Sequence, residues 1–313
     1  MKKQFLTVAV AALALAGCSK NETVEVASNR AIEFNSFVNK NTRAVTEVDQ
    51  LTDFHVFGMY GTTPSEIVFN NESSTKTAYW VASKQYEFGA YYNVDKYEGA
   101  SFDYTTKTLT FPNYTPNNGK DLVVATASHT TDADVTNEGK VQLNFKHMLS
   151  QVKFTFNTTA ADAYTIKISD LKFSAKKTET GTYNSTAGIE WTATGNDAEY
   201  EYSDIADIAD AANNYSGSDV NFVIPQANTD DIEVSFTATL NGPGLTGESS
   251  PFTAKLGYTA SGQGTDNTWT PGYRYNYIVT INPEDIDGTL KKIEFEVQAI
   301  DGWEDATNTT VQP

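Results

Sequence analysis

The sequence predicts an all-β protein. Its apolar residues gather in short runs rich in Val, Ile, Tyr and Phe, the residue types that fit the pleated surface of a strand. Within these runs apolar and polar residues alternate, which is typical of strands with one buried face. Only one stretch has the features of a helix. Many short strands separated by turn residues favour a sandwich or a barrel.

The first half of the chain holds four such segments. In the first of them Phe54, Val56 and Tyr60 point to one side, and in the second Tyr86 and Phe88 do so. Pro, Asn and Gly bound the runs. The segments are LTDFHVFGMYG (51–61), QYEFGAYYNV (85–94), TLTFPNY (108–114) and DLVVATAS (121–128).

The second half continues the pattern. In its last segment Ile293, Phe295 and Val297 face one way and charged or polar residues the other, which predicts a sheet with one wet face. The helix candidate is YSDIADIADAANN (202–214), where Ser203 or Asp204 could cap a short turn. The strand segments are YTIKISDLKF (164–173), VNFVIPQ (220–226), DIEVSFTATL (231–240), YRYNYIVTIN (273–282) and LKKIEFEVQAI (290–300).

The segment VQLNFKHMLSQVKFTF (141–156) changes phase along its length. Its apolar residues are odd-numbered from Val141 to Phe145 and even-numbered from Val152 to Phe156. One uninterrupted strand would turn its core face to water at that change. We therefore expect a bulge or bend near residues 148–151.

A polar stretch upstream of this segment suggests a domain boundary. The sequence SHTTDADVTNEGK (128–140) has no apolar period. The predicted division is an N-terminal β domain over residues 31–138 and a C-terminal β domain over residues 139–313.

The N-terminus has the features of a secretion signal. Lys2 and Lys3 precede an apolar run that is too short to cross a bilayer, and the run ends in Leu-Ala-Gly-Cys at Cys18. This ending resembles the bacterial lipobox, whose cysteine is acylated; a buried structural cysteine is the alternative. Residues 1–17 are predicted as a lipoprotein signal peptide, Cys18 as the lipidation site, and residues 18–30 as a polar tether.

Charge and motifs exclude several functions. Removal of residues 1–17 leaves 20 basic and 40 acidic residues, a net charge of −20 that repels nucleic acid. The three histidines, His55, His129 and His147, lie far apart in sequence, and no zinc set, nucleophile elbow or complete calcium loop is present. We expect no enzyme activity, no cofactor and no metal. Trp80, Tyr91 and Tyr92 could stack on sugars, although strand aromatics are usually core residues.

Taken together, these segments resemble the fimbrillin family of Bacteroidetes, the precursors of type V pili. The resemblance implies two transthyretin-like β-sandwich domains in tandem, outer-membrane localisation through the lipid, and assembly with other fimbrillin subunits by strand exchange that supports adhesion. The matching pieces are Cys18, NTRAVTEVDQLTDFHVFGMY (41–60), Trp80, YEFGAYYN (86–93), DLVVATAS (121–128), VQLNFKHMLSQVKFTF (141–156), FVIPQ (222–226), WTPGYRYNYIVTI (269–281) and VQAIDGW (297–303).

The family resemblance also implies a protease step. An arginine-specific protease cuts early in the first domain, and a neighbour's strand fills the vacated groove. Cleavage between Arg43 and Ala44 would remove AIEFNSFV (31–38), whose Ile32, Phe34 and Phe37 we predict as the strand-exchange residues. Cleavage at Arg30, the second choice, would leave that segment in place.

One departure from the family concerns the C-terminus. Stalk subunits carry extra donor strands there, whereas only the polar tail EDATNTTVQP (304–313) follows Trp303. Donation could use residues 290–300, or the chain could be a tip, anchor or non-polymerising relative. The alternative function is a stand-alone surface lipoprotein that binds glycan or another ligand, and the receptor is not predicted.

Overall fold

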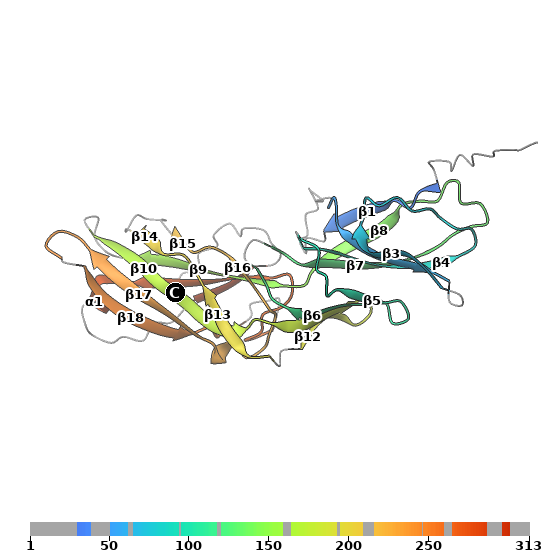
Figure 1. The fold of residues 1–313 in the computed structure, drawn as a ribbon. Coiled ribbons are helices and arrows are strands. Elements are labelled where there is room, and N and C mark those ends of the chain that lie inside the picture. The colour runs from blue at the N-terminus through green and yellow to red at the C-terminus, as the bar shows by residue number, and fades with distance from the viewer. Residues whose placement is uncertain are drawn as a thin grey trace, which may run out of the picture.

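The computed structural model confirms the all-β prediction for the residues it describes (Figure 1). Helix within them is limited to single turns, such as α1 (Pro283–Ile286) and the 3₁₀ turn Thr229–Asp231. The described residues are 30–38, 51–61, 65–93, 95–117, 120–158, 164–192, 195–208, 216–245, 247–259, 265–286 and 296–300.

Two sheets form the part of the molecule that begins the chain. A six-stranded sheet has the order β1-β8-β7-β4-β2-β3, and a four-stranded sheet has the order β12-β11-β6-β5. The strands are β1 (Phe34–Val38), β2 (His55–Tyr60), β3 (Glu66–Ser73), β4 (Gln85–Tyr92), β5 (Ser101–Asp103), β6 (Thr108–Tyr114), β7 (Val123–Thr130), β8 (Val141–His147), β11 (Glu179–Asn184) and β12 (Gly188–Thr192).

Two five-stranded sheets form the other part, and Figure 1 shows them beside the first pair. One has the order β13-β10-β17-β18 with β14 also on β10, and the other has the order β15-β9-β19-β20 with β16 also on β9. The strands are β9 (Ser150–Thr158), β10 (Thr165–Lys176), β13 (Asp197–Glu201), β14 (Ile205–Ile208), β15 (Ser216–Gly217), β16 (Asn221–Val223), β17 (Glu233–Asn241), β18 (Glu248–Lys255), β19 (Arg274–Ile281) and β20 (Glu296–Ile300).

Three apolar clusters lie between and against these sheets. The largest is built by strands β9 to β19 and includes Phe154, Tyr277 and Trp269. The six-stranded sheet is buried on both faces, because Phe88 of β4 belongs to one cluster and Tyr91 of the same strand to another. Residues an odd number apart in a strand point to opposite faces, so β4 contributes to two cores at once.

The predicted phase change is confirmed as a break between two strands. β8 ends at His147 and β9 begins at Ser150. Val141 and Phe145 lie in the cluster under β1, whereas Val152 and Phe156 lie in the largest cluster. The chain thus leaves one sheet and enters another where the apolar period shifts.

A hairpin crosses the sequence position proposed as a domain boundary. Strands β11 and β12 follow residue 139, yet β11 pairs antiparallel with β6, which precedes it. The indole Nε1 of Trp191 in this hairpin donates to the Met148 carbonyl at 2.8 Å. The division at 138/139 and the number of sandwich domains stay predictions, and any division must accommodate this hairpin.

The helix prediction for residues 202–214 is wrong where the structure describes it. Ile205–Ile208 forms β14, which pairs antiparallel with β10 through Ile166↔Ile208 and Ile168↔Ile205. Both isoleucines of β14 are buried in the largest cluster. The local helical period therefore lost to pairing with an adjacent strand, a tertiary effect that sequence periodicity does not contain.

Buried tyrosines predict a loss of stability at alkaline pH. Burial raises the pKa of Tyr91 and that of Tyr104 to about 12, above the ordinary value of about 10. The unfolded chain releases these protons first, so it binds fewer protons than the folded chain between the two values. We expect the free energy of unfolding to be unaffected by this below about pH 10 and to fall as the pH rises toward about 12.

Urea unfolding at a series of pH values, with tyrosinate absorbance followed in parallel, tests this expectation. Tyrosinate should appear together with loss of near-ultraviolet circular dichroism. Complete tyrosine ionisation in a chain that keeps its near-ultraviolet signal would contradict it.

Candidate strand-exchange groove

The first described strand is an edge strand that closes the core of its sheet. β1 pairs in parallel with β8 from Phe34↔Val141 to Val38↔Phe145, and it stands at one end of the strand order. Ahead of it, the Ile32 amide donates to the Ala78 carbonyl at 2.8 Å, and the Trp80 amide donates to the Arg30 carbonyl at 3.0 Å. The segment is thus held along its whole described length by backbone hydrogen bonds.

Phe34 is the aromatic anchor of this segment. Its ring meets the rings of Phe54, Phe69 and Phe88 at centroid distances of 5.8, 5.6 and 5.7 Å, each in an edge-on arrangement. Such aromatic pairs contribute about 0.5–1.5 kcal/mol each beyond their buried area. Gly58 makes room for this packing, because a Cβ there would lie 2.9 Å from the Phe88 ring and 3.0 Å from that of Phe69.

The contact between Phe34 and Phe69 shows how the sheet is shaped. β1 and β3 stand at opposite ends of the strand order, yet their side chains touch across the core. β8 pairs with β7 only at Val123 and Val124. The β1–β8 pair therefore folds over the remaining strands and covers the apolar cluster from one side.

Alternate residues of the segment point into that cluster. Ile32 is 5% exposed within it, and Phe34 and Val38 pack against it. Between them, Ser36 is 4% exposed and its Oγ donates to the Leu51 carbonyl at 2.7 Å. Sequence analysis predicted Ile32, Phe34 and Phe37, and it missed Ser36 and Val38.

Phe37 does not belong with the other two predicted residues. It is half-buried and lies an odd number of positions from Phe34, so it points to the opposite face of β1. The structure brings Ile32 and Phe34 to the cluster and leaves Phe37 outside it. The period of two was a signal in the sequence that identifies Ser36 and Val38 instead.

One ion pair marks the outer side of the segment. The Lys140 ammonium lies 2.9 Å from a carboxylate oxygen of Glu33, and both side chains are about half exposed. An exposed pair of this kind contributes less than about 1 kcal/mol. It contributes to register more than to stability.

The predicted processing residues fall on both sides of the described chain. Arg30 is described and half-buried, with its carbonyl bonded to Trp80. Cys18, Arg43 and Ala44 lie outside the described residues.

Removal of β1 would expose a groove with defined chemistry. It would uncover the faces of Phe54, Phe69 and Phe88 and leave the outer edge of β8 without its parallel partner. An apolar trough beside an unpaired strand edge is the surface on which an extended peptide can add as a strand.

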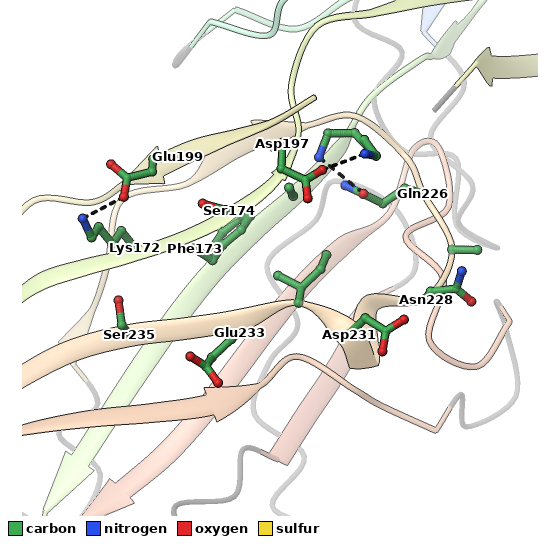
Figure 2. Close-up of a pocket in the computed structure, with 14 residues that line it drawn as sticks. Lys172, Phe173, Ser174, Asp197, Glu199, Gln226, Asn228, Asp231, Glu233 and Ser235 are labelled. Atoms are coloured by element: carbon green, nitrogen blue, oxygen red, sulfur yellow. Dashed lines mark hydrogen bonds and ion pairs between the residues drawn. The ribbon is translucent and has the colours of Figure 1, made fainter. Parts of the chain in front are cut away.

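A second candidate site is a polar pocket on the other part of the molecule (Figure 2). Its volume is about 520 Å³, and β10, β13, β17 and residues 226–231 line it. Lys172 pairs with Glu199 at 2.7 Å and Lys176 with Asp197 at 2.9 Å. The acidic side chains Asp231 and Glu233 leave the lining with a negative balance.

This pocket does not have the features of a sugar-stacking site. The aromatic residue among its lining residues is Phe173, which is 2% exposed and belongs to the core. The prediction that Trp80 and Tyr91 are exposed contacts is wrong, because they are 4% and 0% exposed, and Tyr92 packs against a core cluster. Their rings are used by neighbouring strands, as strand aromatics usually are.

The histidines stay separate in the structure. His129 Nε2 lies 2.8 Å from a Glu138 oxygen, and His147 Nδ1 contacts Asp121. Within the described ranges, no three His, Cys, Asp or Glu side chains come together as a metal site. No helix there is long and apolar enough to cross a membrane.

Comparison with known proteins identifies the family. An all-β chain whose core is closed by one terminal edge strand has the geometry that strand addition uses. A family model described as fimbrillin-like matches residues 22–301. The chain is similar to the fimbrium subunit Fim1C of Phocaeicola vulgatus, with 24% identity over 99% of each chain. The protein belongs to the fimbrillin-like family, whose members are fimbrial and cell-surface adhesion proteins.

Solved structures share the fold. A fimbrial protein from Bacteroides vulgatus superposes with a TM-score of 0.58 at 17% identity, covering 88% of this chain and 100% of that one. A protein from Parabacteroides distasonis assigned to cell adhesion gives a TM-score of 0.52 at 11% identity, covering 90% and 99%. At these identities the likeness concerns the fold.

Proposed function

We propose that this protein is a fimbrial subunit that assembles by exchange of its first strand and supports adhesion at the cell surface. The observation that carries the proposal is the position of β1, an edge strand whose Phe34 completes an aromatic cluster. A terminal edge strand can leave without disrupting an interior ladder. A strand from a neighbouring subunit can then bury the same cluster and pair with β8.

The proposed route begins at the outer membrane. A signal peptide over residues 1–17 directs secretion, and acylation of Cys18 anchors the precursor at the cell surface. An arginine-specific protease then cuts between Arg43 and Ala44, which separates β1 from the rest of the subunit. The fimbrillin-like family and its fimbrial relative support this surface location.

The geometry of Arg30 favours cleavage at Arg43 over the second choice. Arg30 precedes β1, so a cut there leaves the strand attached to its domain. The Arg30 carbonyl also accepts a hydrogen bond from Trp80 inside a strand-like pairing, and paired backbone is a poor protease substrate. A cut after Val38 and before Leu51 separates the strand from the domain it plugs.

Replacement of Arg43 tests the proposal. In the native bacterium, Arg43→Ala is expected to leave a lipidated full-length monomer and to abolish the polymer ladders seen by immunoblotting of unboiled samples. The mature N-terminus of the wild-type protein, measured by mass spectrometry, should be Ala44. Arg30→Ala is the matched control and should assemble normally. Unchanged ladders in Arg43→Ala would overturn this processing site.

A further inference from the structure

The groove under β1 specifies what a replacement strand must carry. From the N-terminus, the buried positions hold isoleucine, phenylalanine, serine and valine at residues 32, 34, 36 and 38. The phenylalanine position has the most demanding surroundings, since three rings contact it edge-on. Between the first two positions, an outward glutamate meets Lys140.

A second segment of the chain repeats this pattern. Ile293-Glu294-Phe295 has the same three residues as Ile32-Glu33-Phe34, and the next alternate residues are Val297 and Ala299. Ile-Glu also occurs at positions 189 and 232, but there the third residue is Trp191 or Val234. In the whole sequence only these two segments have Ile-Glu-Phe.

We propose that residues 293–299 of a second copy of this chain are the donor strand that replaces β1. Phe295 takes the place of Phe34, and the donor runs parallel to β8 in the register of β1. This inference rests on the proposed function, because the groove must first be vacated.

The donor matches the groove at its largest contacts. Phe295 restores the aromatic packing against Phe54, Phe69 and Phe88, and Ile293 restores the aliphatic contact beside it. Glu294 is placed opposite Lys140, as Glu33 is now.

The last two buried positions differ in opposite directions. Val297 exchanges the hydrogen bond from Ser36 to the Leu51 carbonyl for added apolar area, and Ala299 is smaller than Val38.

The position of β20 makes this segment available. β20 (Glu296–Ile300) is at the end of its strand order and pairs antiparallel with β19, from Ile278↔Glu296 to Arg274↔Ile300. Release of an edge strand breaks one ladder and leaves the interior of the sheet intact. Pairing with β8 of the acceptor replaces the ladder that is lost.

Disulfide trapping tests both the donor and its register. The acceptor is the chain from residue 18 with Cys18→Ser and Gln142→Cys, treated with an arginine-specific protease and freed of β1 by mild urea. Gln142 is exposed and pairs with Asn35. The probe is a peptide of residues 291–300 with Glu296→Cys, the position that corresponds to Asn35. Opposite residues on paired strands lie about 5 Å apart, within reach of a disulfide.

The expected result is a mixed disulfide between the peptide and the acceptor, detected by mass spectrometry. A peptide with Gln298→Cys should instead react with an Asn144→Cys acceptor, since Asn144 pairs with Phe37. The two mismatched combinations should form at least about tenfold less product. Equal yields in all four combinations would overturn the proposed register.

A peptide of residues 31–38 with Asn35→Cys separates this inference from the proposed function. If this peptide links to the Gln142→Cys acceptor and the 291–300 peptide does not, the groove exists but the donor assignment is overturned. If neither peptide links, or if the protease does not free β1, strand exchange itself is overturned.

Discussion

A disulfide between Asn35→Cys and Gln142→Cys within one chain is expected to abolish assembly. The two residues are direct partners in the β1–β8 ladder, and their side chains point away from the apolar cluster. Parallel neighbours at this separation suit a disulfide without backbone movement. The bond would hold β1 in the groove even after the protease has cut the chain, so no neighbour's strand could enter.

The measurement is polymer formation by the purified, Cys18→Ser double variant after treatment with an arginine-specific protease. Ladders should be absent under oxidising conditions and return when dithiothreitol reduces the bond. Each single cysteine variant is a control and should assemble as the parent does. Ladders formed by the oxidised double variant, with the disulfide confirmed by mass spectrometry, would show that β1 need not leave.

Phe34→Ala is expected to lower the free energy of unfolding by about 3 kcal/mol, because it deletes a large side chain from a packed site and removes three edge-on ring contacts. The cavity opens toward Phe69 and Phe88, whose positions are fixed by the close approach of Gly58. The neighbouring strands therefore have little freedom to collapse into it.

Phe37→Ala is the matched control, since it deletes the same side chain from the opposite face of β1. It should cost less than about 1 kcal/mol, as most substitutions of partly exposed residues do. Urea unfolding of the uncleaved precursor, followed by circular dichroism, measures both values. Equal destabilisation by the two variants would contradict the assignment of Phe34 as the anchor.

The local alternation of apolar residues predicted which residues of several strands face the core. Val56, Phe88 and Phe145 were each predicted to face inward, and each is buried in the same cluster. The period of two is a property of the strand alone, so a single segment contains enough information to assign its faces. The same rule applied to 31–38 excludes Phe37, which was included for its size alone.

The amount of helix shows the limit of that local rule. Residues 205–208 carry isoleucines at a spacing that suits a helical turn, yet β10 offers an edge on which they pair as a strand. Pairing with a distant segment supplies hydrogen bonds and burial together, and these outweigh a difference in local propensity. No window of the sequence around these residues contains that partner.

The sequence by itself determined that this chain is all-β, that its leader ends in a cysteine, and that an apolar segment precedes Arg43. Only the tertiary structure decided that this segment is a strand at the edge of its sheet, and that Phe34 reaches the strand at the opposite edge. It also decided that Trp80 and Tyr91 are core residues. The physical reason is that side-chain direction follows from local backbone geometry, whereas partners are set by sheet order and curvature, which depend on all the strands together.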